Sequence, residues 1–276
     1  MNRIGFMQGR MSALVNGQIQ SFPRHHWREE FSLAGQQSLS LMEWTLDHKG
    51  LYENPLLTSE GQLEIQTLSA QYGVTIPSLT GDCFMQAPFW KASKTDCVSL
   101  KRDFLKVVET CSAIDLKIIV VPLVDNGSIK ETEHEDVLVE FMLRNAEVFQ
   151  KSGVVIVFES DFGPSELNRF ISRLPKDIFG VNYDTGNSAS LGYHYEQEFS
   201  AYWDRVMNVH VKDRLLDGTT VPLGTGNARL PETISALERK GYSGNYILQT
   251  ARAIDGDHVG VLCRYRDMLQ SWMEKI

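Results

Sequence analysis

The chain has 276 residues, of which 42% are hydrophobic and 22% charged, the composition of a globular protein that can bury a large core. Its formal net charge of −8 disfavours nucleic acid or an anionic membrane as the general partner, because both attract basic surfaces. The four cysteines form no C-x-x-C pair, and the chain has neither an apolar signal core nor a run of ~20 apolar residues. We therefore expect a cytoplasmic protein with reduced thiols that does not span a membrane.

Short apolar runs alternate with helical patterns through the first half of the chain. The expected strands are 4–7, 39–44, 74–79 and 117–123, and the expected helices are 27–37, 59–72, 94–114 and 133–151. Residues 11–26 are too long for an ordinary strand-to-helix loop, and their Asn16-Gly17 pair predicts a tight hairpin. This hairpin is either a lid over the barrel mouth or a surface hairpin without a functional role.

The alternation continues to the end of the chain. Further strands are expected around 154–158, 179–183, 207–209 and 246–248, and further helices at 164–174, 196–206, 231–240 and 259–274. Eight strand–helix units without a linker predict a parallel (β/α)₈ TIM barrel that forms a single domain over residues 1–276. An open doubly wound sheet is the alternative, although no G-x-G-x-x-G motif follows the first strand.

Four of these runs end in side chains that bind metals. Glu159, Asp184 and His210 each follow an apolar run at steps of 25 and 26 residues, and Gln249 follows the last strand. A step of this length is about one strand, one helix and two loops. Since the carboxyl ends of parallel strands meet at one face of a barrel, we expect these four side chains to converge in an active site.

The motifs that carry these residues resemble a known family. Phe158-Glu-Ser160, Asp184-Thr-Gly-Asn187 and His210-Val-Lys-Asp213 are similar, in order and spacing, to motifs of the xylose isomerase-like TIM-barrel superfamily. That superfamily includes sugar phosphate isomerases and epimerases, inosose dehydratase and the family 2 apurinic (AP) endonucleases. The resemblance covers nearly the whole chain. It implies one divalent metal held by Glu159, Asp184 and His210.

The fourth position departs from the family pattern. The resemblance implies a glutamate at the end of the eighth strand, where this chain has Gln249. In similar ketose 3-epimerases, the carboxylates of strands five and eight move a proton on opposite faces of the substrate. An amide binds a hard cation through its oxygen but does not titrate, so the sequence leaves two-base epimerisation open to question.

The expected ligand set suits Mn²⁺, Mg²⁺ or Co²⁺, with Zn²⁺ as an alternative. Such an ion would polarise the carbonyl of a hydroxy-ketone and stabilise an enediolate. We expect Glu159 to act as the base and Lys212, or another nearby acid, to supply the complementary proton. The alternative to a metal site is that these residues form a purely structural hydrogen-bond network at the barrel mouth.

Other residues at the expected carboxyl ends are candidates for binding substrate. Arg10, Arg214, Arg252 and His258 suggest an anionic group on the substrate. Glu43 and Asp82 are expected to orient ligands or substrate hydroxyls. Trp90 lies in an aromatic-rich loop that stacks on a sugar, closes a homo-oligomer interface or packs locally.

The first functional hypothesis is a divalent-metal-dependent isomerase or epimerase acting on a sugar or sugar phosphate. A dehydratase similar to inosose dehydratase and a non-catalytic sugar-binding barrel are the alternatives, and both follow from Gln249. An AP endonuclease fits poorly, because the expected strands two and three lack the histidines of those enzymes and the chain is acidic.

Overall fold

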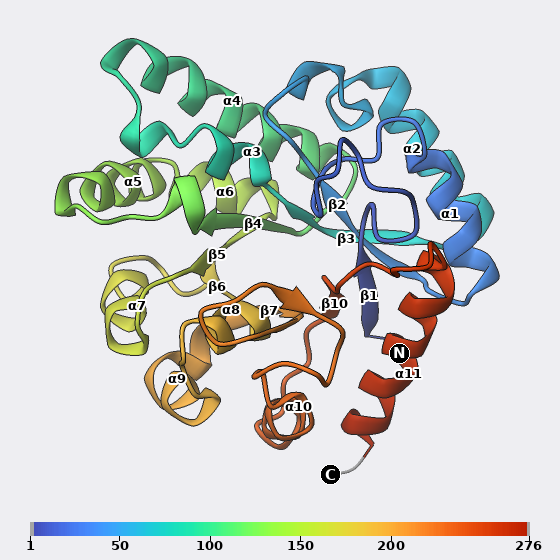
Figure 1. Cartoon of the computed structure of the whole chain (residues 1–276). Helices are drawn as coiled ribbons and strands as arrows, with labels where there is room; N and C mark the ends of the chain where they lie inside the picture. Colours follow the sequence, from blue (N-terminus) through green and yellow to red (C-terminus); the bar gives the residue numbers. More distant parts are fainter. Residues whose placement is uncertain (1–2, 275–276) are drawn as a thin grey trace.

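The computed structural model describes residues 3–274, and its centre is a closed barrel of eight parallel strands (Figure 1). The strands are β1 (Ile4–Met7), β2 (Leu41–Thr45), β3 (Thr75–Thr80), β4 (Ile118–Leu123), β5 (Val155–Ser160), β6 (Phe179–Asp184), β7 (Val206–Val211) and β10 (Tyr246–Leu248). Pairing of Ile4 in β1 with Tyr246 in β10 closes the ring. The predicted (β/α)₈ barrel is confirmed.

Helices surround the barrel between successive strands (Figure 1). The outer helices are α1 (Trp27–Gln36), α2 (Ser59–Tyr72), α4 (Lys94–Ala113), α5 (Thr132–Arg144), α6 (Ala146–Ser152), α7 (Pro164–Ile171), α9 (Tyr195–Tyr202), α10 (Leu230–Arg239) and α11 (His258–Met273). Short 3₁₀ turns lie at η1 (Leu51–Glu53), η2 (Pro55–Leu57), η3 (Phe89–Lys91), η4 (Asp125–Gly127) and η5 (Trp203–Arg205). None of the helices described between residues 3 and 274 is long and apolar enough to cross a bilayer.

The barrel and its helices share one core. All positions of β6 are buried, as expected for a strand covered on both faces in a parallel sheet. Outside the sheet, the Phe104 ring of α4 packs against Phe141 and Phe149, with ring centroids 5.4 and 6.0 Å apart. Each fully buried phenylalanine of this kind contributes about 1.5–3 kcal/mol of transfer free energy. This packing makes the barrel a rigid frame for the residues at its mouth.

The segment after β1 contains the predicted tight turn. Val15 and Gln18 form an antiparallel bridge, and Asn16 and Gly17 both have positive φ, at 52° and 74°. This backbone suits a two-residue hairpin turn, which requires left-handed conformations that asparagine and glycine adopt at low cost. The predicted hairpin is therefore confirmed, whereas its role as a lid stays a prediction.

Several elements differ from the expected ones. The expected helix over 133–151 is two helices, α5 and α6, which meet at Asn145, whose side-chain amide donates to the Phe141 carbonyl at 2.8 Å. Such local side-chain bonds compete with a continuous helix. Short helices α3 (Asp82–Gln86) and α8 (Thr185–Ser190) follow β3 and β6, and a small ribbon of β8 (Asp213–Arg214) and β9 (Thr220–Val221) follows β7. All three additions lie just after strand ends, and they shape the barrel mouth.

Candidate active site

A polar cavity of about 370 Å³ opens at the carboxyl ends of the strands. The charged residues that line it are Arg10, Asp82, Asp125, Glu159, Asp161, Lys212 and Arg214. Gln249, which follows β10, also lines it. Active sites of TIM barrels lie at this face, because each strand delivers a side chain to the same mouth.

Three neighbouring strands bring the predicted ligands together. Glu159 comes from β5, Asp184 from the end of β6 and His210 from β7, and Asp184 pairs with His210 in the strand register. One ligand atom from each lies within 4.8 Å of the others, and all three side chains are buried. The structure thus places these residues as a single cluster, as the sequence predicted.

The imidazole of His210 is fully buried between two carboxylates. Nε2 lies 2.7 Å from Oε1 of Glu43, and Nδ1 lies 3.0 Å from Oε2 of Glu159. Burial alone would lower the pKa of His210, but the two carboxylates outweigh it and raise the pKa to about 10. In the absence of metal the ring is therefore an imidazolium at neutral pH. A metal that binds Nδ1 would have to displace its proton.

Glu159 is held as a carboxylate by two asparagine amides and by the neighbouring charges of His210 and Lys212. Its Oε1 accepts from Nδ2 of Asn187 at 2.6 Å, and Oε2 accepts from Nδ2 of Asn182 at 2.8 Å. Burial alone would raise the pKa of Glu159, but the hydrogen bond and charge of His210, together with the charge of Lys212, hold that pKa below its usual value. A group that is ionised at neutral pH and faces the cavity has the form of a general base.

Asp184 uses its two oxygens differently. Oδ1 accepts from the backbone N–H groups of Gly186 and Asn187, both at 2.8 Å, and so caps α8. Oδ2 has no directed hydrogen bond, but the ammonium of Lys212 lies 2.8 Å away. The structure shows that the cap needs one oxygen and leaves the other facing a cation.

Lys212 connects Asp184 to Gln249. Its ammonium donates to Oε1 of Gln249 at 2.9 Å while it contacts Asp184. The amide oxygen of Gln249 therefore points toward the ligand cluster rather than away from it. A cation that uses both Oδ2 of Asp184 and Oε1 of Gln249 would compete with this ammonium.

The donor set fits a divalent cation. His210 has Nε2 committed to Glu43 and Nδ1 turned toward Glu159, and Asp184 has Oδ2 free of its capping role. Two carboxylates and an imidazole form a site that hard and borderline divalent ions accept. Glu43 then has the place of the carboxylate that orients a ligating histidine from behind.

The predicted cationic residues divide into two groups. Arg10 and Arg214 line the cavity, and burial, followed by the charge of Arg252, lowers the pKa of Arg10 to about 9. Arg252 and His258 are not among the lining residues. Arg252 instead donates to the Ser12 carbonyl and, at 3.4 Å, to the Ile19 carbonyl, so it braces the loop after β1.

Two other substrate-binding expectations need correction. Glu43 does not line the cavity and is fully buried beneath His210, so of its two expected roles the structure favours orienting a ligand. Trp90 is also buried, and its indole N–H donates to the Gly127 carbonyl at 3.1 Å. Local packing therefore accounts for Trp90, and its proposed sugar contact is wrong.

Sequence reasoning missed a layer of amides under the ligands. Asn208 donates from Nδ2 to Oδ1 of Asn182 at 2.9 Å and to Oε2 of Glu43 at 3.1 Å. Asn182 and Asn208 stand two residues before Asp184 and His210, and residues two apart in a strand share a face. That spacing was the signal that could have identified them.

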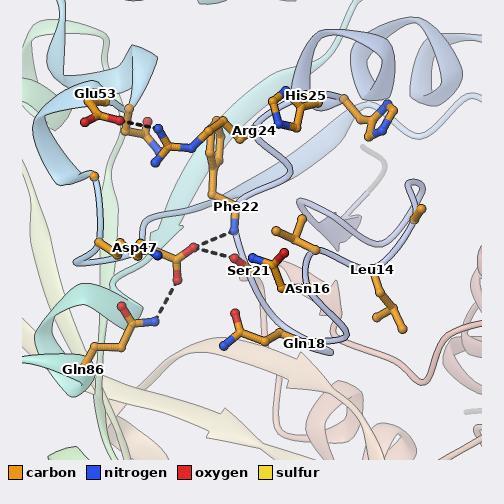
Figure 2. A pocket seen from close by; sticks show the side chains of 16 residues that line it. Leu14, Asn16, Gln18, Ser21, Phe22, Arg24, His25, Asp47, Glu53 and Gln86 are labelled. Atoms are coloured by element: carbon orange, nitrogen blue, oxygen red, sulfur yellow. Dashed lines mark hydrogen bonds and ion pairs between the residues drawn. The ribbon is translucent and has the colours of Figure 1, made fainter.

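A second cavity of about 730 Å³ is lined in part by the loop after β1, including Asn16, Gln18 and Ser21 (Figure 2). Gln86 borders both cavities. Oδ2 of Asp47 accepts from Ser21 and Phe22, and its Oδ1 accepts from Gln86, all at 2.8 Å. The metal-ligand cluster found among the described residues is not in this larger cavity, so we assign the chemistry to the smaller one.

Comparison with known proteins agrees with this geometry. The family model of the xylose isomerase-like TIM barrel matches residues 38–270, and the chain belongs to that family. A curated relative is the putative L-ribulose-5-phosphate 3-epimerase SgbU of Haemophilus influenzae, which is 21% identical over 267 residues, covering 90% of this chain and 92% of the relative.

Solved structures share the fold. The IOLI protein with a bound zinc atom superimposes with a TM-score of 0.74 at 15% identity, over 99% of this chain and 98% of that one. D-psicose 3-epimerase of Clostridium cellulolyticum H10, solved with D-tagatose, gives a TM-score of 0.70 at 14% identity, over 99% and 98%. The named similar enzymes are thus sugar epimerases, and one similar structure holds a divalent metal.

Proposed function

We propose that this protein is a divalent-metal-dependent isomerase or epimerase that acts on a ketose or ketose phosphate through an enediolate. The observation that carries the proposal is the convergence of Glu159, Asp184 and His210 within 4.8 Å at the barrel mouth. The epimerase activities named for similar proteins support the same class. One similar structure is described with zinc, which supports a metal.

Glu159, Asp184 and His210 would hold the ion, with Gln249 as a neutral fourth ligand. The ion, which we propose to be Mn²⁺, Mg²⁺ or Co²⁺, would polarise the substrate carbonyl and offset the charge that develops on its oxygen. Glu43 keeps Nε2 of His210 engaged, so that the ring presents Nδ1. This arrangement fixes which nitrogen faces Glu159.

Glu159 is the proposed base. It is ionised at neutral pH because of His210 and Lys212, and two asparagine amides hold its orientation. A fixed carboxylate can remove the acidified proton next to a substrate carbonyl. Lys212 is the proposed group that stabilises the resulting oxyanion, since its ammonium already lies among the ligand oxygens.

We further propose that the substrate carries an anionic group. Arg10 is buried with its Nε lacking a hydrogen-bond partner, and it lines the cavity together with Arg214. The charge of Arg252 disfavours the protonated form of Arg10, and a bound phosphate or carboxylate would relieve this repulsion. The Nη1 of Arg10 donates to the Ile19 carbonyl at 2.7 Å, but a buried guanidinium without an anion in direct contact is costly to keep charged.

The test has a binding arm and a turnover arm. Protein purified without chelator is titrated with Mn²⁺, Co²⁺ and Mg²⁺ by calorimetry, and we expect about one site per chain that is lost in His210→Ala. L-ribulose 5-phosphate and D-tagatose are then incubated with the metal-loaded protein in D₂O, and we expect exchange of a proton next to the carbonyl that is lost in Glu159→Gln. Protein that binds none of the three ions and exchanges neither ketose would end the proposal.

Gln249 favours one second candidate, a dehydratase that needs only one base to start β-elimination. The same incubations separate the two reactions. Loss of water, seen as an enone or its diketone product, indicates the dehydratase, whereas a product of unchanged mass indicates the isomerase or epimerase.

A further inference from the structure

Inversion at a carbon next to a carbonyl requires proton removal on one face and proton delivery on the other. Glu159 is placed for the first step, but Gln249 has no titratable proton for the second. Lys212 is a poor substitute, because its ammonium is engaged by Asp184 and Gln249 on the same side as the ligands. A second proton donor must therefore come from another part of the cavity.

The cavity offers three further carboxyl groups, and their surroundings differ. Asp161 accepts from Ser128 Oγ at 2.6 Å and from Lys130 Nζ at 2.8 Å, so it is already engaged by a hydroxyl and by an ammonium. Asp125 is exposed to solvent. Asp82 is buried yet lines the cavity, and among the described residues it forms no ion pair. Asp82 alone combines burial, access to the cavity and freedom from a cation in direct contact.

The barrel places Asp82 across the mouth from His210. The ligand cluster occupies β5, β6 and β7, which are consecutive in the ring. Asp82 directly follows β3, and in the closed order β1-β10-β7-β6-β5-β4-β3-β2 that strand stands opposite β7. In the same order only β4 separates β3 from β5, so Glu159 and Asp82 reach a substrate in the cavity from two different strands of the ring.

The surroundings of Asp82 favour its protonated form. Burial and the charges of Asp47 and Glu159 raise its pKa to about 7, against the opposing effects of the Gln20 hydrogen bond and the Arg10 charge. Below that pH the carboxyl carries a proton, and above it the proton is released. Near neutrality an acid of this strength can donate in one step and recover its proton in the next.

We propose that Asp82 is a catalytic residue that delivers the second proton. The chain would then epimerise ketoses with Asp82 as the acid, because Gln249 has no proton to supply. This inference rests on the proposed function. It assigns the reaction as inversion at the carbon beside the ketone, with Glu159 and Asp82 acting on opposite faces of the substrate.

The proton balance closes without a further reactant. Glu159 takes the proton from C3, the carbon beside the C2 ketone. The electron pair of the broken C–H bond forms the C2–C3 double bond, and the negative charge moves to the carbonyl oxygen. The carboxyl of Asp82 then protonates C3 on the opposite face, and the carbonyl re-forms. Glu159 is left protonated and Asp82 ionised, and exchange with water at the cavity mouth restores both groups.

The experiment follows two rates in the same sample. L-ribulose 5-phosphate and D-tagatose are incubated with the protein and Mg²⁺ in D₂O, and NMR records both the loss of the C3 proton from the starting ketose and the appearance of its C3 epimer. Wild type should show both events. Asp82→Asn should form the epimer at least about a hundredfold more slowly, while C3 exchange in the starting ketose continues.

Three variants complete the design. Asp177→Asn, at an exposed aspartate that does not line the cavity, should behave as wild type, and Glu159→Gln should lose both rates. Asp82→Ser removes the carboxyl with a smaller side chain and should reproduce the split between exchange and epimer formation. An unfolded variant would lose both rates and its thermal transition, so it is not mistaken for this split.

Three results would overturn the inference. Epimer formation at the wild-type rate in both Asp82→Asn and Asp82→Ser would remove Asp82 from the reaction and leave the proposed function intact. Folded Asp82 variants that lose C3 exchange together with epimer formation would show that Asp82 serves binding instead. Wild-type protein that exchanges no proton of either ketose would refute the proposed function itself, and the inference with it.

Discussion

Glu43 accepts a hydrogen bond from Nε2 of His210 at 2.7 Å, although the two residues lie on strands that are not neighbours in the barrel. Both side chains are fully buried. This contact fixes the orientation of the imidazole and keeps Nδ1 turned toward Glu159 and Asp184. Since orienting carboxylates support ligand basicity as well as geometry, Glu43 should control metal binding without touching the metal.

We therefore predict that Glu43→Gln weakens binding of Mn²⁺ or Co²⁺ by about 10- to 100-fold. The change removes one of the two charges that raise the pKa of His210, but it also frees the ring to rotate, and we expect the loss of orientation to dominate. Calorimetric titration measures the effect. Glu135→Gln is the matched control, because Glu135 is also a buried carboxylate but lies on α5. Equal affinity for wild type and Glu43→Gln would contradict the prediction.

Replacing Gln249 with glutamate should strengthen metal binding. The change adds a negative charge where an amide oxygen now faces the ligand cluster, and we expect roughly tenfold tighter binding, or about 1.4 kcal/mol. The measurement is the dissociation constant for Mn²⁺ at fixed pH and ionic strength. Gln18→Glu adds the same charge on the exposed hairpin and should leave the constant unchanged. A Gln249→Glu variant that binds metal no better than wild type would show that residue 249 is not a ligand.

Arg10 should select for an anionic substrate. Losing a charge-assisted hydrogen bond costs about 1.5–3 kcal/mol, so Arg10→Gln should raise the KM for a ketose phosphate by about ten- to a hundredfold and change the KM for the unphosphorylated sugar little. Inorganic phosphate should also protect wild type more than the variant in thermal unfolding. Arg252→Gln is the control, because Arg252 braces the same loop through the Ile19 carbonyl but does not line the cavity. An equal rise of KM for both sugars would assign Arg10 to structure.

A buried carboxylate away from the site should contribute to stability. Glu135 accepts bidentate bonds from Arg169 at 2.7 and 2.6 Å and a further bond from Arg173 at 2.5 Å. The hydrogen bond from Arg169 outweighs the effect of burial and, with Arg173, lowers the pKa of Glu135. Because both arginines are partly exposed, we predict a modest loss of about 1 kcal/mol for Glu135→Gln.

The pH dependence of this loss follows from the sign of the shift. A carboxylate whose pKa is lower in the folded protein stabilises the fold above its unfolded pKa of ~4.3, and this stabilisation disappears as the pH falls through the folded value. Urea unfolding of wild type and Glu135→Gln should therefore differ at pH 7 and converge below pH ~4. A difference that grows toward acid would contradict the assignment.

The sequence predicted the features that follow from the regular spacing of strands and from local backbone preference. Glu159, Asp184 and His210 follow strands at nearly equal spacing, and in a parallel barrel that spacing determines their convergence. Asn16-Gly17 predicted its hairpin because only a few residue types adopt the required backbone. Gln249 was also placed correctly at the mouth, although its contact with Lys212 depends on side-chain rotamers that no pattern encodes.

The sequence pattern could not predict contacts between side chains that are far apart along the chain. Whether Glu43 faces substrate or His210 depends on the strand register across the barrel, and Trp90 was misassigned because an aromatic loop residue has the same pattern whether it is buried or exposed. The sequence singled out Asp82 only as a residue that orients ligands or substrate hydroxyls. Its raised pKa depends on burial and on Asp47 and Glu159, which only the folded chain brings near.

The two oxygens of Asp184 divide one side chain between folding and chemistry. Asparagine, which retains a capping oxygen, would preserve the start of α8 while reducing the ligand charge, whereas alanine would release the helix together with Asn187, a hydrogen-bond donor to Glu159. Replacing Asp184 by alanine would therefore disturb the position of Glu159 as well as the binding of the metal ion. Asp184→Asn is therefore the substitution that separates the helix-capping role of residue 184 from its role as a metal ligand.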